Sequence, residues 1–588
     1  MIRYLNKSIF LLLLVSGVAS GQPVFTMDLN GQSTSSGHIL RLLGSVGDGS
    51  FGVPVAGGYD MDGDTKNDFA MASFLADPPG RSNAGQVFLV FGDRRIEGEI
   101  DTLNSHPDVL VIIGEQLSEH AGSEIWMDEV TDDAFGDLLI CRQDFSPPGR
   151  LGGGALTLIP GQPMLRTMAA NNEVLDLGNP PPGLQILHIW GATAGSRLGI
   201  WARTGDITDD DINDFIIGAD REASHGNTDA GAVYLFRGGE YLETSPTIDL
   251  ADFGTVDNGN LARLLPPVVS TQFHFGATVQ VADLDGNGAE VLAAAALNRA
   301  GASLAPLGGS GNGSGGTPDG TLFIAWDDNF NNDWIPDEGG SLEVTMGIGA
   351  GSFTSIDGVA GKNDDFGEEI LGGLDYDNDG NADLFVGDLT ADGWGAINRP
   401  NNAGTGHVIY DAQMLKNLHF DLDDAVLPPG FSMSTFLGPV PGALGGDTAM
   451  HGDFTGDGIA DLAFSSPHDN PFARINAGTI HILLGQTGEW PTFIDLAPAS
   501  FPSSNDISII EVYGANGNAP GGDSGDTLSY SGAFGDMNGD GILDIITNEM
   551  KGNGSSPSAV DVGNLLLLDV FKIVNSIFEG GFESPPED

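Results

Sequence analysis

The chain has 588 residues and a formal net charge of −60, and 88 of its residues are Gly. An acidic surface of this kind repels nucleic acid and anionic lipid, which excludes both as expected partners. Hydrophobic residues make up 40 % of the chain, enough for a large folded core, and the single Cys141 excludes an internal disulfide framework.

The first residues of the chain have the features of a secretory signal peptide, which we predict over residues 1–20. Arg3 and Lys7 provide a basic start, Ile9–Ala19 is an apolar run, and Val18–Ser20 offers small residues for cleavage. A membrane anchor is the alternative, but about 11 apolar residues are too few to span a bilayer. We therefore expect an exported protein, secreted or at the cell surface, without membrane insertion once the signal is removed.

A nine-residue acidic pattern, D-x-[DNT]-x-D-x-x-x-D, recurs through the rest of the chain. Two of its seven copies are incomplete, because residues 129–137 begin with Glu129 and residues 283–290 are one residue short. The first positions lie 69 residues (60 to 129) to 92 residues (283 to 375) apart, which indicates a repeat architecture. The five complete copies begin at Asp60, Asp206, Asp375, Asp453 and Asp536.

Each acidic copy is followed by segments that we predict to be strands. A short apolar run comes first, then a Gly-led strand such as residues 84–92, and then an apolar-Asp-Leu element such as Leu175-Asp176-Leu177. These short runs, bounded by Gly, Asn and Pro, favour buried strands over helices. Four strands per unit in seven units predict an all-β, seven-bladed β-propeller over residues 22–573. Unit four departs from the pattern at residues 341–346.

The two ends of the chain suggest how the ring closes. Unit seven lacks an apolar-Asp-Leu element, whereas the N-terminal segment contains one, Met27-Asp28-Leu29, that no preceding unit owns. We therefore predict that this N-terminal strand completes the last blade, which would remove free sheet edges. Residues 574–588 would form a tail beyond the propeller, either disordered or resembling the sorting tags of some exported bacterial proteins.

The units resemble the FG-GAP repeats of the integrin α-subunit propeller and its bacterial relatives. Phe51-Gly52, Phe275-Gly276 and Phe366-Gly367 lie eight or nine residues before the first Asp of their units, and Leu198-Gly199 replaces the pair in unit three. The resemblance covers about residues 22–573 and implies a propeller with an adhesion-like role. It is limited to the propeller, so it implies no integrin β-type partner.

The acidic copies predict binding sites for a hard cation. Oxygen-bearing side chains at positions 1, 3, 5 and 9 can converge on one ion, and a Gly at position 6 permits the sharp bend. Calcium fits better than magnesium, because its looser shell accepts a cage made of protein oxygens, and zinc or iron would call for His or Cys. An EF-hand is excluded, since position 12 lacks Glu. Ion-free, solvated turns remain the alternative.

Five loops carry the full set of predicted calcium ligands, and those of units two and four are incomplete. We expect the ions to brace the ring, each filled site contributing about 1 kcal/mol at millimolar calcium. A further cluster (Asn329, Asn331, Asp333 and Asp337) also fits the template, with a long polar turn as the alternative. The ligands predicted for the repeats are Asp60, Asp62, Asp64 and Asp68; Asp206, Thr208, Asp210 and Asp214; Asp283, Asp285 and Asn287; Asp375, Asp377, Asp379 and Asp383; Asp453, Thr455, Asp457 and Asp461; and Asp536, Asn538, Asp540 and Asp544.

No catalytic motif stands out in the chain. Residues 522–525 read Gly-Asp-Ser-Gly, like the nucleophile segment of trypsin-like proteases, but the next Gly and a suitably placed His are missing, so we do not expect Ser524 to be a nucleophile. We predict a binding or adhesion module for extracellular protein or glycan ligands. A polysaccharide lyase or hydrolase on a propeller platform and a structural matrix component remain alternatives. Aromatic side chains with acids or bases in a central cleft would favour the enzyme.

Overall fold

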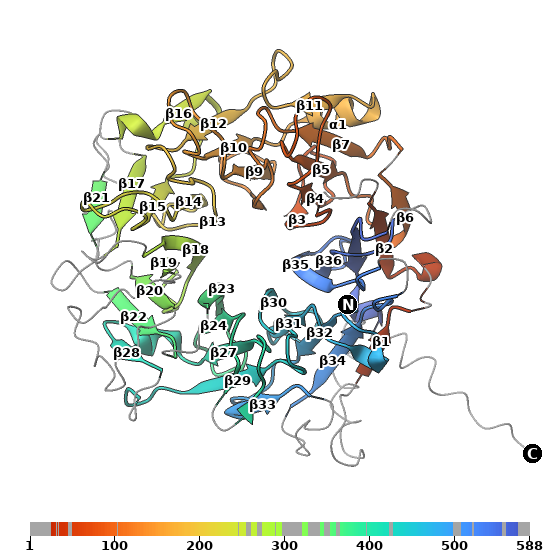
Figure 1. Ribbon diagram of the computed structural model, residues 1–588, viewed down its shortest axis with the longest axis vertical. Helices are drawn as coiled ribbons and strands as arrows, with labels where there is room; N and C mark the ends of the chain where they lie inside the picture. Colours follow the sequence, from red (N-terminus) through yellow and green to blue (C-terminus); the bar gives the residue numbers. More distant parts are fainter. Residues whose placement is uncertain are drawn as a thin grey trace, which may run out of the picture.

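The computed structural model describes residues 25–573 apart from positions 31, 33, 45–49, 103, 245, 254–259, 267–272, 289, 297–319, 327–341, 346–352, 360–364, 395–396, 423–426, 498–506, 520–522 and 555–559. The predicted signal peptide, the C-terminal tail and the cluster from Asn329 to Asp337 lie outside the described residues. Seven five-stranded sheets stand around a common axis (Figure 1), which confirms the all-β, seven-bladed propeller.

Each blade is named after the unit whose acidic loop it carries, and its strands are given in order from the axis outward. Blade one contains β3 (Val55–Tyr59), β4 (Asp68–Ser73), β5 (Gln86–Val90), β7 (Val109–Ile113) and β11 (Val174–Asp176). Blade two contains β8 (Ile125–Asp128), β9 (Asp137–Arg142), β10 (Ala155–Ile159), β12 (Leu187–Trp190) and β16 (Thr247–Asp249). Blade three contains β13 (Ala202–Gly205), β14 (Asp214–Ala219), β15 (Ala232–Phe236), β17 (Leu261–Leu265) and β21 (Leu342–Thr345).

The remaining blades repeat this arrangement. Blade four contains β18 (Phe275–Ala282), β19 (Val291–Ala296), β20 (Thr321–Ala325), β22 (Phe353–Asp357) and β28 (His419–Asp421). Blade five contains β23 (Phe366–Leu374), β24 (Asp383–Asp388), β27 (Thr405–Ile409), β29 (Met433–Leu437) and β33 (Phe493–Asp495). Blade six contains β30 (Ala449–Gly452), β31 (Asp461–Ser466), β32 (Thr479–Leu483), β34 (Ile509–Tyr513) and β1 (Phe25–Asp28). Blade seven contains β35 (Leu528–Gly535), β36 (Asp544–Glu549), β37 (Asn564–Leu568), β2 (Ile39–Leu43) and β6 (Glu97–Asp101).

The other described elements lie in the connections between strands. They are the α-helices α1 (Pro163–Ala170) and α2 (Tyr241–Thr244), the short hairpin strands β25 (Gly393–Trp394) and β26 (Ile397–Asn398), and the 3-10 turns η2 (Thr34–Ser36), η3 (Leu250–Asp252), η6 (Ala412–Leu415) and η7 (Pro471–Ala473).

The outermost strand of each blade is parallel to its neighbour and comes from another part of the chain. In blade one, β11 pairs in parallel with β7, and Leu175 lies opposite Ile112. Most of these strands are the apolar-Asp-Leu elements of the sequence, each placed in the blade that precedes its own unit. The predicted four strands per unit are therefore the antiparallel part of each blade, and the exchanged fifth strand ties neighbouring blades together.

An N-terminal strand closes the ring, as predicted, although it is not the strand that carries Met27. The strand β2 pairs antiparallel with β37 and completes blade seven, whose fifth strand is β6. The assignment of Met27-Asp28-Leu29 to the last blade is wrong, because β1 pairs in parallel with β34 of blade six and places Met27 opposite Val512. The reason is the strand exchange: an apolar-Asp-Leu element always joins the preceding blade.

A glycine after the fourth strand is the sequence signal that could have identified β2. The N–H of this glycine donates to a carbonyl at the start of the third strand, as Gly514 does to Gly478 at 2.9 Å. A Cβ atom on Gly514 would lie 1.9 Å from the Ala477 carbonyl oxygen, so the approach requires glycine. Gly44 follows β2 in the same way and donates to Gly563 at 3.0 Å.

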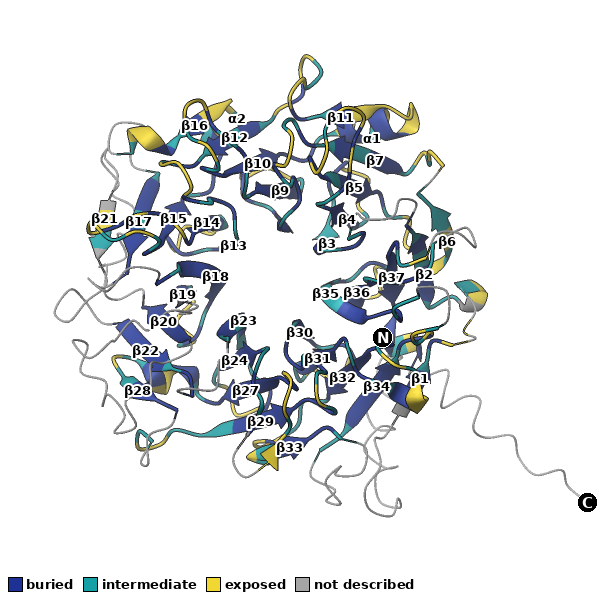
Figure 2. Ribbon diagram, viewed as in Figure 1, coloured by how far each residue is buried: buried dark blue, intermediate teal, exposed yellow. Residues whose placement is uncertain are grey.

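The core consists of seven apolar clusters, one between each pair of neighbouring blades, and most strands are buried (Figure 2). Between blades seven and one, Leu42, Phe69 and Leu567 are among the residues that pack together, so the closing contact is as apolar as the others. Full burial of each such side chain contributes about 1.5–3 kcal/mol. No helix in the described part of the chain is both long and apolar enough to cross a membrane.

Candidate metal centres in the acidic loops

Each acidic copy forms the tight loop between the innermost and second strands of its blade. We call residues 60–68, 129–137, 206–214, 283–290, 375–383, 453–461 and 536–544 loops one to seven. Because strand direction alternates within a blade, all seven loops lie at the same end of the ring.

The Asp at position 1 folds its loop around its own carboxylate. In loop seven, Asp536 Oδ1 accepts the N–H of Gly539 at 2.7 Å and of Asp540 at 3.0 Å, and Oδ2 accepts that of Gly541 at 2.8 Å. Gly541, at position 6, has a φ of 87°, a left-handed conformation that favours glycine. Equivalent N–H groups approach the carboxylates of Asp60, Asp206, Asp283, Asp375 and Asp453.

The Asp at position 9 begins the second strand and connects the loop to the third. Asp461 is fully buried, and its two oxygens accept the N–H of Phe454 at 3.0 Å and of Gly485 at 2.9 Å. Burial nevertheless raises the pKa of Asp461 to about 7. Burial also raises the pKa of Asp68, Asp383 and Asp544 to about 8, and of Asp137 and Asp214 to about 7.

In loops four, five and six, the side chain at position 3 holds a buried oxygen atom that lacks a partner among the described residues. Asp377 is only 7 % exposed, and its Oδ1 accepts no hydrogen bond from the described residues. Asp285 Oδ1 and Thr455 Oγ1, at the same position of loops four and six, are likewise buried without a partner among the described residues. An unsatisfied buried oxygen costs stability, whereas oxygen is the ligand that calcium prefers. The donor set therefore fits a calcium ion.

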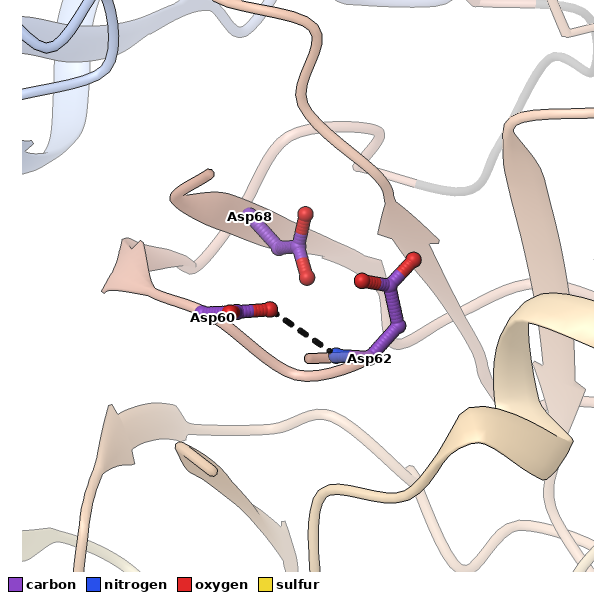
Figure 3. A group of neighbouring side chains, drawn as sticks. All are labelled: Asp60, Asp62 and Asp68. Atoms are coloured by element: carbon purple, nitrogen blue, oxygen red, sulfur yellow. Dashed lines mark hydrogen bonds between the residues drawn. The ribbon is translucent and has the colours of Figure 1, made fainter. Parts of the chain in front are cut away.

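Three carboxylates converge in two of the loops. In loop one, Asp60, Asp62 and Asp68 each offer an oxygen within 4.8 Å of the others (Figure 3). In loop five, the same holds for Asp375, Asp377 and Asp379, a set that excludes Asp383. Burial, followed by repulsion from Asp379 and Asp375, raises the pKa of Asp377 to about 6. These are the only groups of three or more such side chains that the described residues bring together within this distance.

At position 5, the side chain is exposed and turns back toward its own loop. Asp379 Oδ1 accepts the N–H of Asn381 at 2.8 Å. Asp64, Asp210, Asp457 and Asp540 accept the N–H two residues on in the same way. The structure thus places the predicted ligands at positions 1, 5 and 9 of the five complete loops in one repeated geometry, whereas position 3 varies: Thr208 Oγ1 and Asn538 Nδ2 donate to Asp214 and Asp544, each at 3.4 Å. Among the described residues, three carboxylates come together only in loops one and five.

The two incomplete loops depart from the full ligand set in different ways. In loop two, Thr131 is fully buried, and its Oγ1 lies 3.2 Å and 3.0 Å from the two oxygens of Asp137, to which it donates. In loop four, Val291 begins the second strand, so no acid occupies position 9. The carboxylate of Glu290 instead lies against Gly205 of blade three, and burial raises its pKa to about 7.

Basic side chains from the next blade reach two of the loops. Lys416 Nζ lies 3.0 Å from Asp285 Oδ2 of loop four. Arg166 Nε lies 3.7 Å from Asp62 Oδ2 of loop one, although the Arg166 guanidinium also donates to Asp108 at 2.5 Å. The carboxylates at positions 1, 3 and 5 of loop five form no ion pair with the described residues.

Arginine side chains at the opposite end of the ring secure the exchanged strands, and sequence reasoning missed them. Arg81 donates through both terminal nitrogens to Asp176 of β11, at 2.8 Å and 2.6 Å, and also to the carbonyl of Gly114 at 2.6 Å. The sequence did contain a signal for this role, because each of these arginines comes three or four residues before the Gly-led strand of its own unit. The equivalent pairs are Arg150–Asp249, Arg399–Asp495 and Arg474–Asp28.

A second group missed from the sequence lies on the innermost strands. Arg203 of β13 donates to Glu124 at 2.7 Å, and its guanidinium lies 4.2 Å from the Trp126 ring and 4.9 Å from the Trp201 ring. Burial raises the pKa of Glu369, on β23, to about 8, although the Arg203 charge lowers it. Blades two, three and five thus contribute charged and aromatic side chains to the region of the axis.

Ser524, considered from the sequence as a nucleophile, is held in a hydrogen bond, and the buried Cys141, His407 and His451 pack in the core. Ser524 Oγ lies 2.7 Å from Asp561 Oδ2, to which it donates, and no histidine of the described part of the chain contacts it. Cys141 is fully buried, and burial raises its pKa. Burial lowers the pKa of His407 to about 3 and of His451 to about 4, so both rings are neutral and packed in the core.

Comparison of the chain with family models gives no match, and comparison with curated proteins also finds none. The resemblance to FG-GAP repeats therefore rests on the sequence motifs, which the propeller architecture accommodates.

Proposed function

We propose that the protein is an exported, calcium-binding propeller of the FG-GAP type that acts as a binding or adhesion module for extracellular protein or glycan ligands. The observation that carries the calcium part is the unpartnered Oδ1 of Asp377, buried beside the carboxylates of Asp375 and Asp379. An ion in loop five would satisfy this oxygen and remove the repulsion among the three charges. Zinc and iron are disfavoured by the all-oxygen donor set.

The end of the ring opposite the acidic loops supports the binding role. Several apolar side chains in the connections there are exposed: Leu117 is 66 % exposed, Leu151 83 %, Phe472 70 % and Ile475 55 %. Leu151 and Ile475 directly follow Arg150 and Arg474, whose contacts with the exchanged strands fix the connections. Exposed apolar groups on ordered connections are typical of interaction surfaces.

The first experiment measures the melting temperature and calcium binding of the full chain, with calcium and with a chelator. We expect saturable calcium binding at submillimolar to millimolar concentration and a lower melting temperature in chelator. Equal melting temperatures and no bound calcium would contradict the metal part of the proposal. A glycan and matrix-protein array then tests the binding part, with the L151S/I475S variant as a control that should lose binding without losing calcium.

A polysaccharide lyase or hydrolase is the second candidate, favoured by the charged and aromatic side chains near the axis. Glu369, with its raised pKa, would remain protonated near neutral pH, as a general acid requires. The test is release of new chain ends from a panel of polysaccharides, compared with the E369Q variant. Product that disappears in E369Q supports the enzyme, and no product from any polysaccharide supports the binding module.

A further inference from the structure

Loops one, four and five are each contacted by the segment that follows the third strand of the next blade. Blade five sends η6 and Lys416 toward loop four, and blade two sends α1 and Arg166 toward loop one. Blade six sends residues 486–488 to loop five, where Gln486 and Gly488 donate their N–H groups to the carbonyls of Tyr376 and Asp377 at 3.1 Å and 2.7 Å. We call these three segments the caps of loops four, one and five.

The caps differ in charge at the point where they meet position 3. The Lys416 ammonium lies 3.0 Å from Asp285 Oδ2 and 5.4 Å from the Trp326 ring, so it sits where a metal ion would meet that carboxylate. The cap of loop five offers only neutral groups: Thr487 lies next to Asn378, with 3.4 Å between Thr487 Oγ1 and Asn378 Nδ2. Asp285 and Asp377 each have an Oδ1 without a partner among the described residues, but only Asp285 has an ammonium group at its other oxygen.

We propose that the caps decide which loops take a free calcium ion, with Lys416 acting as a tethered cation in loop four and the neutral cap of blade six leaving loop five to the ion. The inference rests on the proposed calcium binding. A positive charge on the protein and a divalent ion compete for the same carboxylate oxygen, because their mutual repulsion is strong at such short range. Loop one is intermediate, since Arg166 is farther from Asp62 and is held by Asp108.

The test is the number of calcium ions bound per full-length chain, measured by equilibrium dialysis with metal analysis. We expect K416Q to bind one ion more than the original protein, because Asp285 loses its ammonium partner and can bind an ion beside Asp283 and Asn287. We expect T487K to bind one ion fewer, because the new ammonium can reach loop five. K416R and T487Q are the matched controls and should leave the number unchanged, since the first keeps the charge and the second adds length without charge.

The outcomes separate this inference from the function on which it rests. If the original protein binds no calcium, the proposed function fails. If it binds calcium but K416Q gains no ion, or T487K loses none, the inference is overturned and the proposed function stands. Circular dichroism spectra of all four variants check the fold, and a loss of one ion in T487Q as well as T487K would show that bulk rather than charge is responsible.

Discussion

Loops two and five occupy equivalent places in their blades, yet the side chains at their position 3 differ in hydrogen bonding. In loop two, the hydroxyl of the buried Thr131 donates to Asp137, and the loop satisfies itself. In loop five, the same position is Asp377, which adds a charge and leaves one oxygen without a partner. The difference shows that position 3 can close a loop on its own hydrogen bonds, as Thr131 does, or leave a buried oxygen without a partner among the described residues, as Asp377 does.

The strongest test of the comparison removes the position-9 carboxylate from each loop. D137A in loop two and D383A in loop five each remove a buried carboxylate that accepts backbone N–H groups from two other segments. Two unsatisfied N–H groups cost about 2–6 kcal/mol. We expect this loss in urea unfolding of D137A, with calcium and with chelator alike. If D137A were less stable than the original protein only in calcium, loop two would also be a metal site.

The pH dependence of the free energy of unfolding gives a further test of the comparison between loops two and five. The pKa of Asp377 is raised to about 6 and that of Asp383 to about 8, in both cases mainly by burial, and loop two contributes Asp137 at about 7. Values above that of the unfolded chain mean that the folded protein binds more protons, so stability falls as pH rises from about 4 to about 8. We expect the stability to fall with rising pH in chelator. In calcium the fall should be weaker, because a bound ion favours the ionised carboxylates.

The control for this measurement is D377N, whose urea midpoint in chelator should change less between pH 5 and pH 7 than that of the original protein. Stability that rises over this range in chelator would contradict the raised pKa values.

A pair of substitutions at position 3 should have opposite dependence on calcium. D377A should lose one bound ion and about 1 kcal/mol of stability in millimolar calcium, and lose nothing in chelator, where it removes an unsatisfied charge. T131A should lose about 1 kcal/mol in both conditions, because it breaks hydrogen bonds that need no ion. Differential scanning calorimetry in calcium and in chelator distinguishes the two patterns, and identical behaviour of the variants would refute the comparison.

The smallest expected effect concerns the end of the ring opposite the loops. R474M removes the ion pair with Asp28, 2.7 Å long, that secures β1 to blade six. The pair is partly exposed, so the loss should be about 1 kcal/mol or less. Limited proteolysis should show faster cleavage near residue 30 with calcium binding unchanged. R399M in blade five is the matched control, since it frees an internal strand and should leave the N-terminal segment protected.

Much of the fold was predictable because the same sequence pattern, with the same physical constraints, occurs seven times. Acid at position 1, Gly at position 6 and a buried Asp at position 9 form one hydrogen-bonded turn wherever they occur, as Asp536, Gly541 and Asp544 show. Apolar runs bounded by turn residues could be assigned as strands for the same reason. The exchange of fifth strands was not predictable from one unit, because parallel pairing leaves no mark on the sequence of the strand itself.

The candidate metal sites were also predictable in part from the sequence and in part only from the tertiary structure. The sequence by itself determined which oxygen atoms each loop can offer, since ligand type and spacing are local properties of nine residues. Only the tertiary structure decided which of those carboxylates meet a cationic side chain: Lys416 reaches Asp285 of loop four from another blade, whereas no basic side chain in the described part of the chain forms an ion pair with Asp377. Electrostatic neutralisation acts through space, across contacts between segments far apart in the chain, and local patterns therefore cannot reveal it.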